Sequence, residues 1–237
     1  MKKTRDFNFK KFTVSQDRAT HKVGTDGVLL GAWTNIINEG FVLDIGTGTG
    51  LIALMLAQRT TPNVIVHAVE LQKEDAEQAR ANVNQSPWKD RIMIHNQSIQ
   101  EFKPEIKFDL IVSNPPYFIN SALPPAMERS IVRHTQSLNF EELMHAAKRL
   151  IQPSGRLAVI LPWQESQVFK NISGQQGFHC IRECAFRSRA NKPFERALME
   201  FSQQQSFKVT EELVLHGEGE QWSDEYKQLT KDFYLKI

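Results

Sequence analysis

The sequence contains little cysteine and no long apolar run. Its two cysteines, Cys180 and Cys184, can form neither a disulfide framework nor a four-cysteine zinc site, so we expect no metal. No apolar stretch reaches the roughly 20 residues that a membrane-spanning helix needs. The opening residues, MKKTRD, lead into no apolar block of the kind that signal peptides contain. We therefore expect a cytoplasmic protein without a membrane partner.

The chain also lacks a strong charge imbalance, because its formal net charge is only +2. Basic residues nevertheless gather in two places: residues 1–24, which we interpret as a basic N-terminal arm, and residues 182–196. Such clusters can bind a phosphate backbone electrostatically. Solvated surface charge explains either cluster, taken alone, at least as well.

What the chain does have is a regular alternation of strand and helix patterns. Strands are predicted at residues 41–45, 63–70, 91–96, 108–113, 155–161, 178–186 and 196–202. Helices are predicted at 25–37, 50–59, 73–85, 140–150, 163–173 and 223–234, with Thr25 or Asp26 capping the first. This order predicts one α/β domain over residues 1–237, with a core from residue 25 that ends in a helix. Its Rossmann-like, mostly parallel sheet would have seven strands and helices on both faces.

A glycine-rich turn, Asp44–Gly50 (DIGTGTG), follows the first predicted strand. Gly46, Gly48 and Gly50 let the backbone approach a ligand closely. Asp44 can hold a cationic amino group, directly or through water, and Glu70 at the end of the next strand can accept both hydroxyls of a ribose. The glycines and Glu70 would also suit a dinucleotide, and the two acids could simply cap a turn and end a strand. Together the three features favour S-adenosylmethionine as the cofactor.

The fourth predicted strand runs directly into Asn114, Pro115, Pro116 and Tyr117. An exocyclic amino group conjugated to a ring is a poor nucleophile, because its lone pair is delocalised. The Asn114 side-chain oxygen and the Pro115 carbonyl can accept its two hydrogens, which frees the lone pair for attack on a sulfonium methyl group. The prolines fix the turn, and Tyr117 offers a flat face to a base. This turn predicts N-methylation, but it does not distinguish adenine N6 from a glutamine amide.

With these motifs, the chain resembles the class I amino-methyltransferases and, more narrowly, the bacterial valine-tRNA adenine-37 N6-methyltransferases. The narrower resemblance rests on residues 21–33 (HKVGTDGVLLGAW), 54–60 (LMLAQRT) and 84–88 (NQSPW), and on Tyr226, Leu229, Thr230 and residues 232–235 (DFYL), so it covers nearly the whole chain. It implies S-adenosylmethionine as the cofactor and the anticodon region of one valine tRNA as the substrate. An adenine in a loop is also easier to splay out than one in a duplex.

The resemblance also implies roles for individual residues. Lys22, Gly24 and Thr25 would cover the methionine end of the cofactor, although a helix cap is a compatible role for this segment. Ser98 and Ile99 fall where this fold grips adenine, with Ser98 standing where an acidic residue is common, and Asn114 would also contact the cofactor. The candidate RNA contacts are Lys10, Lys11, Arg18, Arg133, His134, Arg187, Arg189 and Lys192.

Other interpretations stay open at this point. One is methylation of a glutamine amide in a protein, against which the basic arm and the lack of a separate N-terminal helical domain argue. Another is methylation of an adenine in ribosomal RNA. A third is an RNA-binding scaffold that has kept the fold, although intact Asp44, Glu70 and Asn114 argue against decay. A hydride-transfer enzyme would require NAD instead. We expect the protein to act as a monomer.

Overall fold

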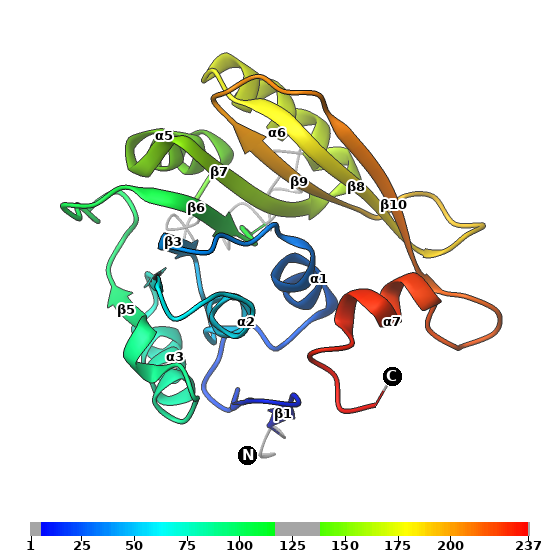
Figure 1. The fold of residues 1–237 in the computed structure, drawn as a ribbon, viewed down its shortest axis with the longest axis horizontal. Coiled ribbons are helices and arrows are strands. Elements are labelled where there is room, and N and C mark those ends of the chain that lie inside the picture. The colour runs from blue at the N-terminus through cyan, green and yellow to red at the C-terminus, as the bar shows by residue number, and fades with distance from the viewer. Residues whose placement is uncertain (1–5, 117–137, 237) are drawn as a thin grey trace, which may run out of the picture.

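The computed structural model describes residues 6–116 and 138–236, which Figure 1 traces in colour. Its main sheet consists of β3 Gly40–Ile45, β4 Val64–Glu70, β5 Ile92–Asn96, β6 Phe108–Ser113, β7 Ile151–Pro162, β8 His179–Arg189, β9 Arg196–Ser202 and β10 Val209–His216. Across the sheet the order is β10-β8-β9-β7-β6-β3-β4-β5. β9 is antiparallel to both of its neighbours, and every other pair is parallel. All strands except β9 therefore end at the same edge of the sheet.

The α/β class and the mostly parallel sheet are confirmed, but the prediction of seven strands is wrong, because the sheet has eight. The missing strand is β10, which pairs in parallel with β8 at the sheet edge. Of its eight residues only Leu213 is buried. An edge strand that is largely exposed needs no continuous apolar run, so its sequence gave no clear strand pattern.

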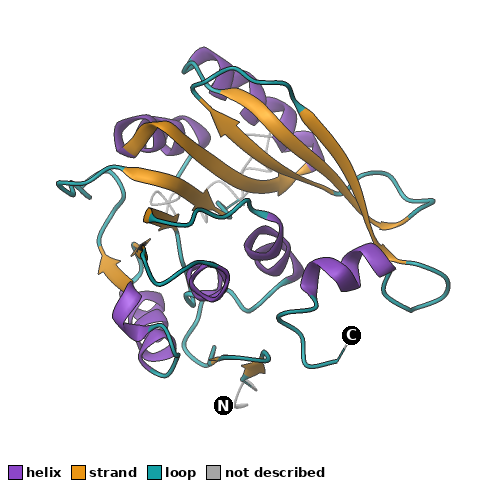
Figure 2. Ribbon diagram, in the orientation of Figure 1, coloured by secondary structure: helices purple, strands orange, loops and turns teal. Residues whose placement is uncertain are grey.

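Helices cover both faces of the sheet, as Figure 2 shows. The helices α1 Thr25–Trp33, α2 Leu51–Arg59, α3 Lys73–Asn84 and α7 Asp224–Thr230 lie on one side, and α5 Phe140–Leu150 and α6 Trp163–Gln175 lie on the other. The first helix was predicted to end at residue 37, but α1 ends at Trp33. Thr34 leaves the helical conformation, with φ −51° and ψ 133°, and the Asn35 N–H donates to the Glu200 carboxylate at 2.6 Å. The N-cap of α1 is Gly24, so the capping role predicted for Thr25 or Asp26 is wrong.

The N-terminal segment packs against the C-terminal segment (Figure 1). The short strands β1 Phe7–Asn8 and β2 Thr13–Val14 pair in antiparallel fashion, and Phe9 forms an isolated bridge with Tyr234. Phe9 is buried and its ring centroid lies 6.0 Å from that of Tyr234, so aromatic side chains join the two ends. Within residues 6–116 and 138–236, no helix combines the length and the apolar character needed to cross a membrane.

Candidate active site

Three parallel strands bring the two sequence motifs to one edge of the sheet. β3 lies between β4 and β6, so Asp44 stands opposite both Ala68 and Val112. The glycine turn follows β3, Glu70 ends β4, and Asn114 follows β6. We call the carboxyl ends of the parallel strands the active edge. In α/β sheets ligands bind beyond this edge, so its position supports the choice of both motifs as the site.

The glycine turn requires glycine at three positions. Gly46, Gly48 and Gly50 have φ angles of 72°, 55° and 82°, a region that other residues rarely adopt. The N–H groups of Gly46 and Thr47 donate to the Val69 carbonyl at 2.9 and 3.2 Å, which anchors the turn to β4. A Cβ atom on Gly46 or Gly48 would meet no described atom within 4 Å. The backbone of the turn therefore faces open space in which a ligand could lie.

Asp44 is completely buried beneath this turn. Its Oδ2 accepts hydrogen bonds from the Thr47 hydroxyl at 2.6 Å and from the Ala53 N–H at 3.2 Å. Its Oδ1 has no hydrogen-bond partner among the residues that the structure describes. Burial raises the pKa of Asp44 from 3.8 to about 7, against the opposing effect of the two hydrogen bonds. A cationic group beside Oδ1 would favour the ionised form.

Glu70 links the end of β4 to the glycine turn. Its side chain is largely buried, and its two oxygens accept the N–H groups of Gly48 and Gln72, each at 2.9 Å. Burial raises the pKa of Glu70, and these backbone hydrogen bonds oppose the rise. A carboxylate oxygen can accept more than one hydrogen bond, so both oxygens can still receive a hydroxyl. Glu70 is therefore not the surface strand end that the alternative interpretation required.

The loop after β5 places Ser98 and Ile99 beside Glu70, because the Gln97 N–H donates to the Glu70 carbonyl at 3.1 Å. Ile99 is buried, and Ser98 is partly buried. The structure adds Leu71 to the residues that could line the adenine ring, a residue that was not predicted from the sequence. Its apolar side chain is 39% exposed directly after Glu70, so it offers a second apolar surface to a flat ring. The available signal was a large apolar residue immediately after an acid that ends a strand.

The predicted catalytic turn extends β6 beyond the sheet. Ser113 is buried and its hydroxyl donates to the Ile45 carbonyl at 2.9 Å, which joins β6 to β3 just before the two motifs begin. Asn114 is partly buried, Pro115 is buried and Pro116 is exposed. Tyr117, Arg133 and His134 lie outside the described residues. The described part of the turn, residues 114–116, is thus adjacent to the glycine turn, as the predicted reaction requires.

The segment that contains Lys22, Gly24 and Thr25 also reaches the active edge. All three residues are exposed, and they lead directly into α1. The start of α1 lies against the start of α2, because a Cβ atom on Gly27 would come within 3.0 Å of the Leu51 side chain. Leu51 follows the last glycine of the turn. The structure thus brings this segment and the glycine turn together.

The candidate RNA contacts lie in different parts of the molecule. Arg187 and Arg189 are at the end of β8, and Lys192 is in the connection to β9, so these three lie at the active edge. Lys10 and Lys11 instead adjoin Phe12, whose ring lies 5.8 Å from that of Trp88, just before β5. They therefore lie near the opposite edge of the sheet, where the parallel strands begin. Arg18 is exposed and lies alongside α3, where its backbone N–H donates to Gln78 Oε1.

Most of the basic residues in the second cluster, residues 182–196, form ion pairs with carboxylates. Arg187 pairs with Glu212 at 2.9 Å, and Arg189 pairs with Glu220 at 2.5 Å. Lys192 is exposed and takes part in no ion pair within the described part of the chain. A phosphate that bound the two arginines would compete with the glutamates. The sequence did not reveal this, because both glutamates lie beyond the cluster in the chain.

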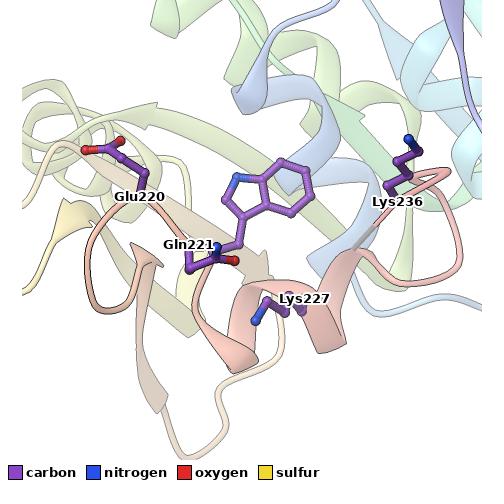
Figure 3. A pocket seen from close by; sticks show the side chains of 5 residues that line it. Glu220, Gln221, Lys227 and Lys236 are labelled. Carbon is purple, nitrogen blue, oxygen red and sulfur yellow. The ribbon is translucent and has the colours of Figure 1, made fainter.

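Two further features lie apart from this site. A shallow pocket of about 260 Å³ is lined by Glu220, Gln221, Trp222, Lys227 and Lys236 (Figure 3), none of which belongs to the motifs at the active edge. Two of its charged groups are already paired, Glu220 with Arg189 and Lys227 with Asp224. No group of three or more His, Cys, Asp or Glu side chains that could hold a metal ion occurs in the described ranges.

Comparison with known proteins gives the family. The family model described as a methyltransferase small domain matches residues 23–172. The chain is 43% identical over 231 residues to the tRNA1(Val) (adenine(37)-N6)-methyltransferase of Phocaeicola vulgatus, with 98% of both chains covered. It is 42% identical to the protein of the same name from Histophilus somni, with 100% of both chains covered. The chain belongs to this methyltransferase family.

Other relatives agree with this assignment. The tRNA1(Val) (adenine(37)-N6)-methyltransferase of Yersinia pestis is 44% identical, over 97% of this chain and 93% of that one. Among solved structures, a predicted O-methyltransferase from Agrobacterium tumefaciens matches with a TM-score of 0.71 at 18% identity, covering 88% of this chain and 96% of that one. A glycopeptide N-methyltransferase in complex with S-adenosylmethionine matches with a TM-score of 0.56 at 14% identity, covering 79% and 91%. These structures show that the family shares the methyltransferase fold.

Proposed function

We propose that this enzyme transfers a methyl group from S-adenosylmethionine to the N6 amino group of adenine 37 in a valine tRNA. The names of relatives that match over nearly their full length support the reaction and the substrate. The structural observation that carries the proposal is the meeting of the glycine turn, Glu70 and Asn114 at one edge of the sheet. We further propose that the protein acts as a monomer in the cytoplasm and reads the anticodon region.

The residues at the active edge fit S-adenosylmethionine. The open space above Gly46 and Gly48 would accept a ligand close to the backbone. The buried, unpartnered Oδ1 of Asp44 would receive the amino group of the methionine moiety, directly or through water. Glu70 would hold the ribose hydroxyls, while Ser98, Ile99 and the newly found Leu71 would line the adenine. Lys22, Gly24 and Thr25 would cover the methionine end.

Asn114 and Pro115 would prepare the target nitrogen. Bound S-adenosylmethionine supplies an electrophilic methyl group. The Asn114 side-chain oxygen and the Pro115 carbonyl would accept the two N–H groups of the adenine, which localises the lone pair on N6. The N6 atom would gain the methyl group as the bond between that methyl group and the sulfonium sulfur breaks, which leaves S-adenosylhomocysteine, and the proton that N6 releases would pass to water. This arrangement acts through orientation and preorganised acceptors, so it requires no strong general base at the nitrogen.

The connection between β8 and β9 is the part of the described surface best suited to the anticodon loop. Trp163, which follows β7, and Phe194 are partly exposed, and their ring centroids lie 4.8 Å apart. The Arg187 guanidinium lies 5.0 Å from the Phe194 ring centroid, and Lys192 is exposed nearby in the chain. Aromatic rings flanked by cations suit unpaired nucleotides, whose bases stack and whose phosphates are negatively charged. Arg18, Lys10 and Lys11 would contribute only longer-range electrostatic attraction of the RNA.

The proposed function is tested by methyl transfer from labelled S-adenosylmethionine to three substrates in parallel: total tRNA lacking this modification, total ribosomal RNA and a protein extract. Nucleosides from the labelled RNA are then separated. We expect N6-methyladenosine in a single tRNA species. A synthetic valine anticodon stem-loop in which guanosine replaces the target adenine is the matched control and should take up no label.

Each other outcome has a distinct meaning. Label in protein glutamine would replace tRNA with a protein substrate, and label in ribosomal RNA would change the RNA class. Cofactor binding without transfer to any of the three would support an RNA-binding scaffold.

A further inference from the structure

The chain segment that precedes α1 is held on α3 by a row of buried polar side chains. We call residues 15–23 the strap. The Ser15 N–H donates to Asn82 Oδ1 at 2.9 Å, the Arg18 N–H to Gln78 Oε1 at 3.4 Å, and the Thr20 N–H to Asp75 Oδ1 at 2.8 Å. The three acceptors are between 2% and 4% exposed. Their spacing places them along one face of α3, so this face is shaped to bind a backbone.

The strap runs along α3 toward the active edge. Its residue numbers rise from Ser15 to Thr20 while those of its partners on the helix fall from Asn82 to Asp75. α3 has 12 residues, so the strap spans much of a helix that is about 18 Å long. The Val23 N–H then donates to Gln16 Oε1 at 2.8 Å, which folds the end of the strap back on itself. The end of the strap therefore lies back beside Gln16, and the chain then enters α1, whose Gly27 lies against Leu51 directly after the glycine turn.

Asn82 connects the strap to the glycine turn. In addition to accepting the Ser15 N–H, its amide nitrogen donates to the Ser15 carbonyl and to the Thr49 carbonyl, both at 2.9 Å. Thr49 stands between the last two glycines of the turn. One buried side chain thus bonds both the start of the strap and the turn. At the other end, Asp75 is close enough to Glu70 to act electrostatically on its carboxyl group.

Simple packing would not require this arrangement. A buried polar side chain is unfavourable unless its hydrogen bonds are satisfied, and an apolar residue on this inner face of α3 would avoid that requirement. The polar row instead fixes where the strap lies along the helix, because each acceptor faces one particular N–H. Displacing the strap would leave the buried acceptors on α3 without these partners.

We propose that Asn82 is a positioning residue of the cofactor site. It holds the strap and the glycine turn in one arrangement, so that residues 22–25 lie over the bound cofactor. Asn82 touches neither the cofactor nor the substrate in this role. The inference rests on the proposed function for the cofactor, but not on the identity of the methylated RNA.

The test measures binding of S-adenosylhomocysteine by calorimetry, well below the unfolding temperature of each variant. We expect N82A to raise the Kd about tenfold, as leaving buried groups unsatisfied typically does. N82D, which keeps the acceptor for the Ser15 N–H but loses the donor to the Ser15 and Thr49 carbonyls, should not restore binding. Q78A should have a smaller effect, since its contact is longer and does not reach the turn. The matched control is R80A, whose guanidinium donates to the Ile94 carbonyl rather than to the strap.

Hydrogen exchange of the wild-type protein gives a second measurement that needs no variant. The amide protons of Ser15, Arg18 and Thr20 should exchange more slowly when S-adenosylhomocysteine is bound, whereas that of Lys10, which bonds the Phe233 carbonyl, should not change. An unchanged Kd in N82A would overturn the inference, and so would exchange rates of the strap amide protons that do not change when the ligand binds. Failure of the wild type to bind the ligand would overturn the proposed cofactor as well. Binding without methylation of tRNA would overturn only the proposed substrate.

Discussion

The two halves of the active edge differ in how their polar groups are satisfied. On the cofactor half, at the ends of β3 and β4, Asp44 and Glu70 are 0% and 8% exposed and hydrogen-bonded largely to backbone. On the other half, which we propose binds the substrate and call the substrate half, Arg187 and Arg189 at the end of β8 are more exposed and are paired with glutamate side chains. Buried backbone contacts define a fixed shape, whereas surface ion pairs can exchange partners at little cost. The cofactor half is therefore preformed, and the substrate half can rearrange around a large polyanion.

The largest effect should come from N114A, at the boundary between the two halves. Loss of one acceptor for the target amino group should lower kcat by about 100-fold or more, as removal of a single preorganised group typically does. The Kd for S-adenosylhomocysteine should change little. Single-turnover methylation of an anticodon stem-loop, together with calorimetry, measures both quantities. Comparable turnover in the variant would remove Asn114 from the mechanism.

The second-largest effect should come from D44N, which removes the charged side chain of the cofactor half. Loss of a charged hydrogen bond to the methionine amino group should raise the Kd for S-adenosylmethionine by about 10- to 100-fold. The wild-type affinity should also fall as the pH drops below the Asp44 pKa of about 7, because the protonated carboxyl must ionise to bind a cation. Calorimetry between pH 5.5 and pH 8 checks both points. An equally steep pH dependence in D44N would assign it to another group.

The same residue should make the cofactor-free protein less stable as the pH rises. The folded-state pKa of Asp44, about 7, exceeds the ordinary value of 3.8, so the folded state binds more protons across this interval. Its contribution to stability is thus fully present below pH 3.8 and lost as the pH rises through about 7. The loss amounts to at most about 4 kcal/mol. Urea unfolding at several pH values should show a flatter profile for D44N, and parallel profiles would contradict the assignment.

On the substrate half, F194L should weaken RNA binding without affecting the cofactor. Leucine keeps apolar volume but removes the aromatic face, and stacking of one base contributes about 1 kcal/mol or more. We expect the KM for an anticodon stem-loop to rise about fivefold. F194Y keeps a ring and should restore the wild-type value. If F194L and F194Y behave alike, Phe194 serves packing rather than stacking.

The smallest effect should come from charge reversal, where the position of the lysine decides the outcome. K192E lies at the active edge and should weaken RNA binding severalfold at low salt, less so at high salt. K11E lies near the opposite edge and should have a weaker effect under the same conditions. Lys11 is the better choice than Lys10, whose amino group donates to the Lys231 carbonyl at 2.6 Å. Equal losses in both variants would mean that the RNA contacts both the active edge and the opposite end of the strands.

Elements that depend on local signals could be predicted from the amino-acid sequence. Closely spaced glycines, short apolar runs and an acid at the end of a predicted strand are visible over a few residues, and they located the glycine turn, Glu70 and Asn114. Parallel strands separated by helices then implied that these motifs meet at one edge. The same reasoning failed where an element is stabilised from one side only, as in β10, and where a helix is capped by backbone, as in α1.

Which distant groups pair became visible only in the folded protein. The sequence predicted a helix at residues 73–85 but gave no indication that Ser15 bonds Asn82, 67 positions along the chain. The arginines of β8 read as a basic patch until Glu212 and Glu220 were found beside them. Hydrogen bonds and ion pairs depend on distance in space, and a single sequence records only distance along the chain. The motifs were therefore readable in advance, whereas the contacts that position them were not.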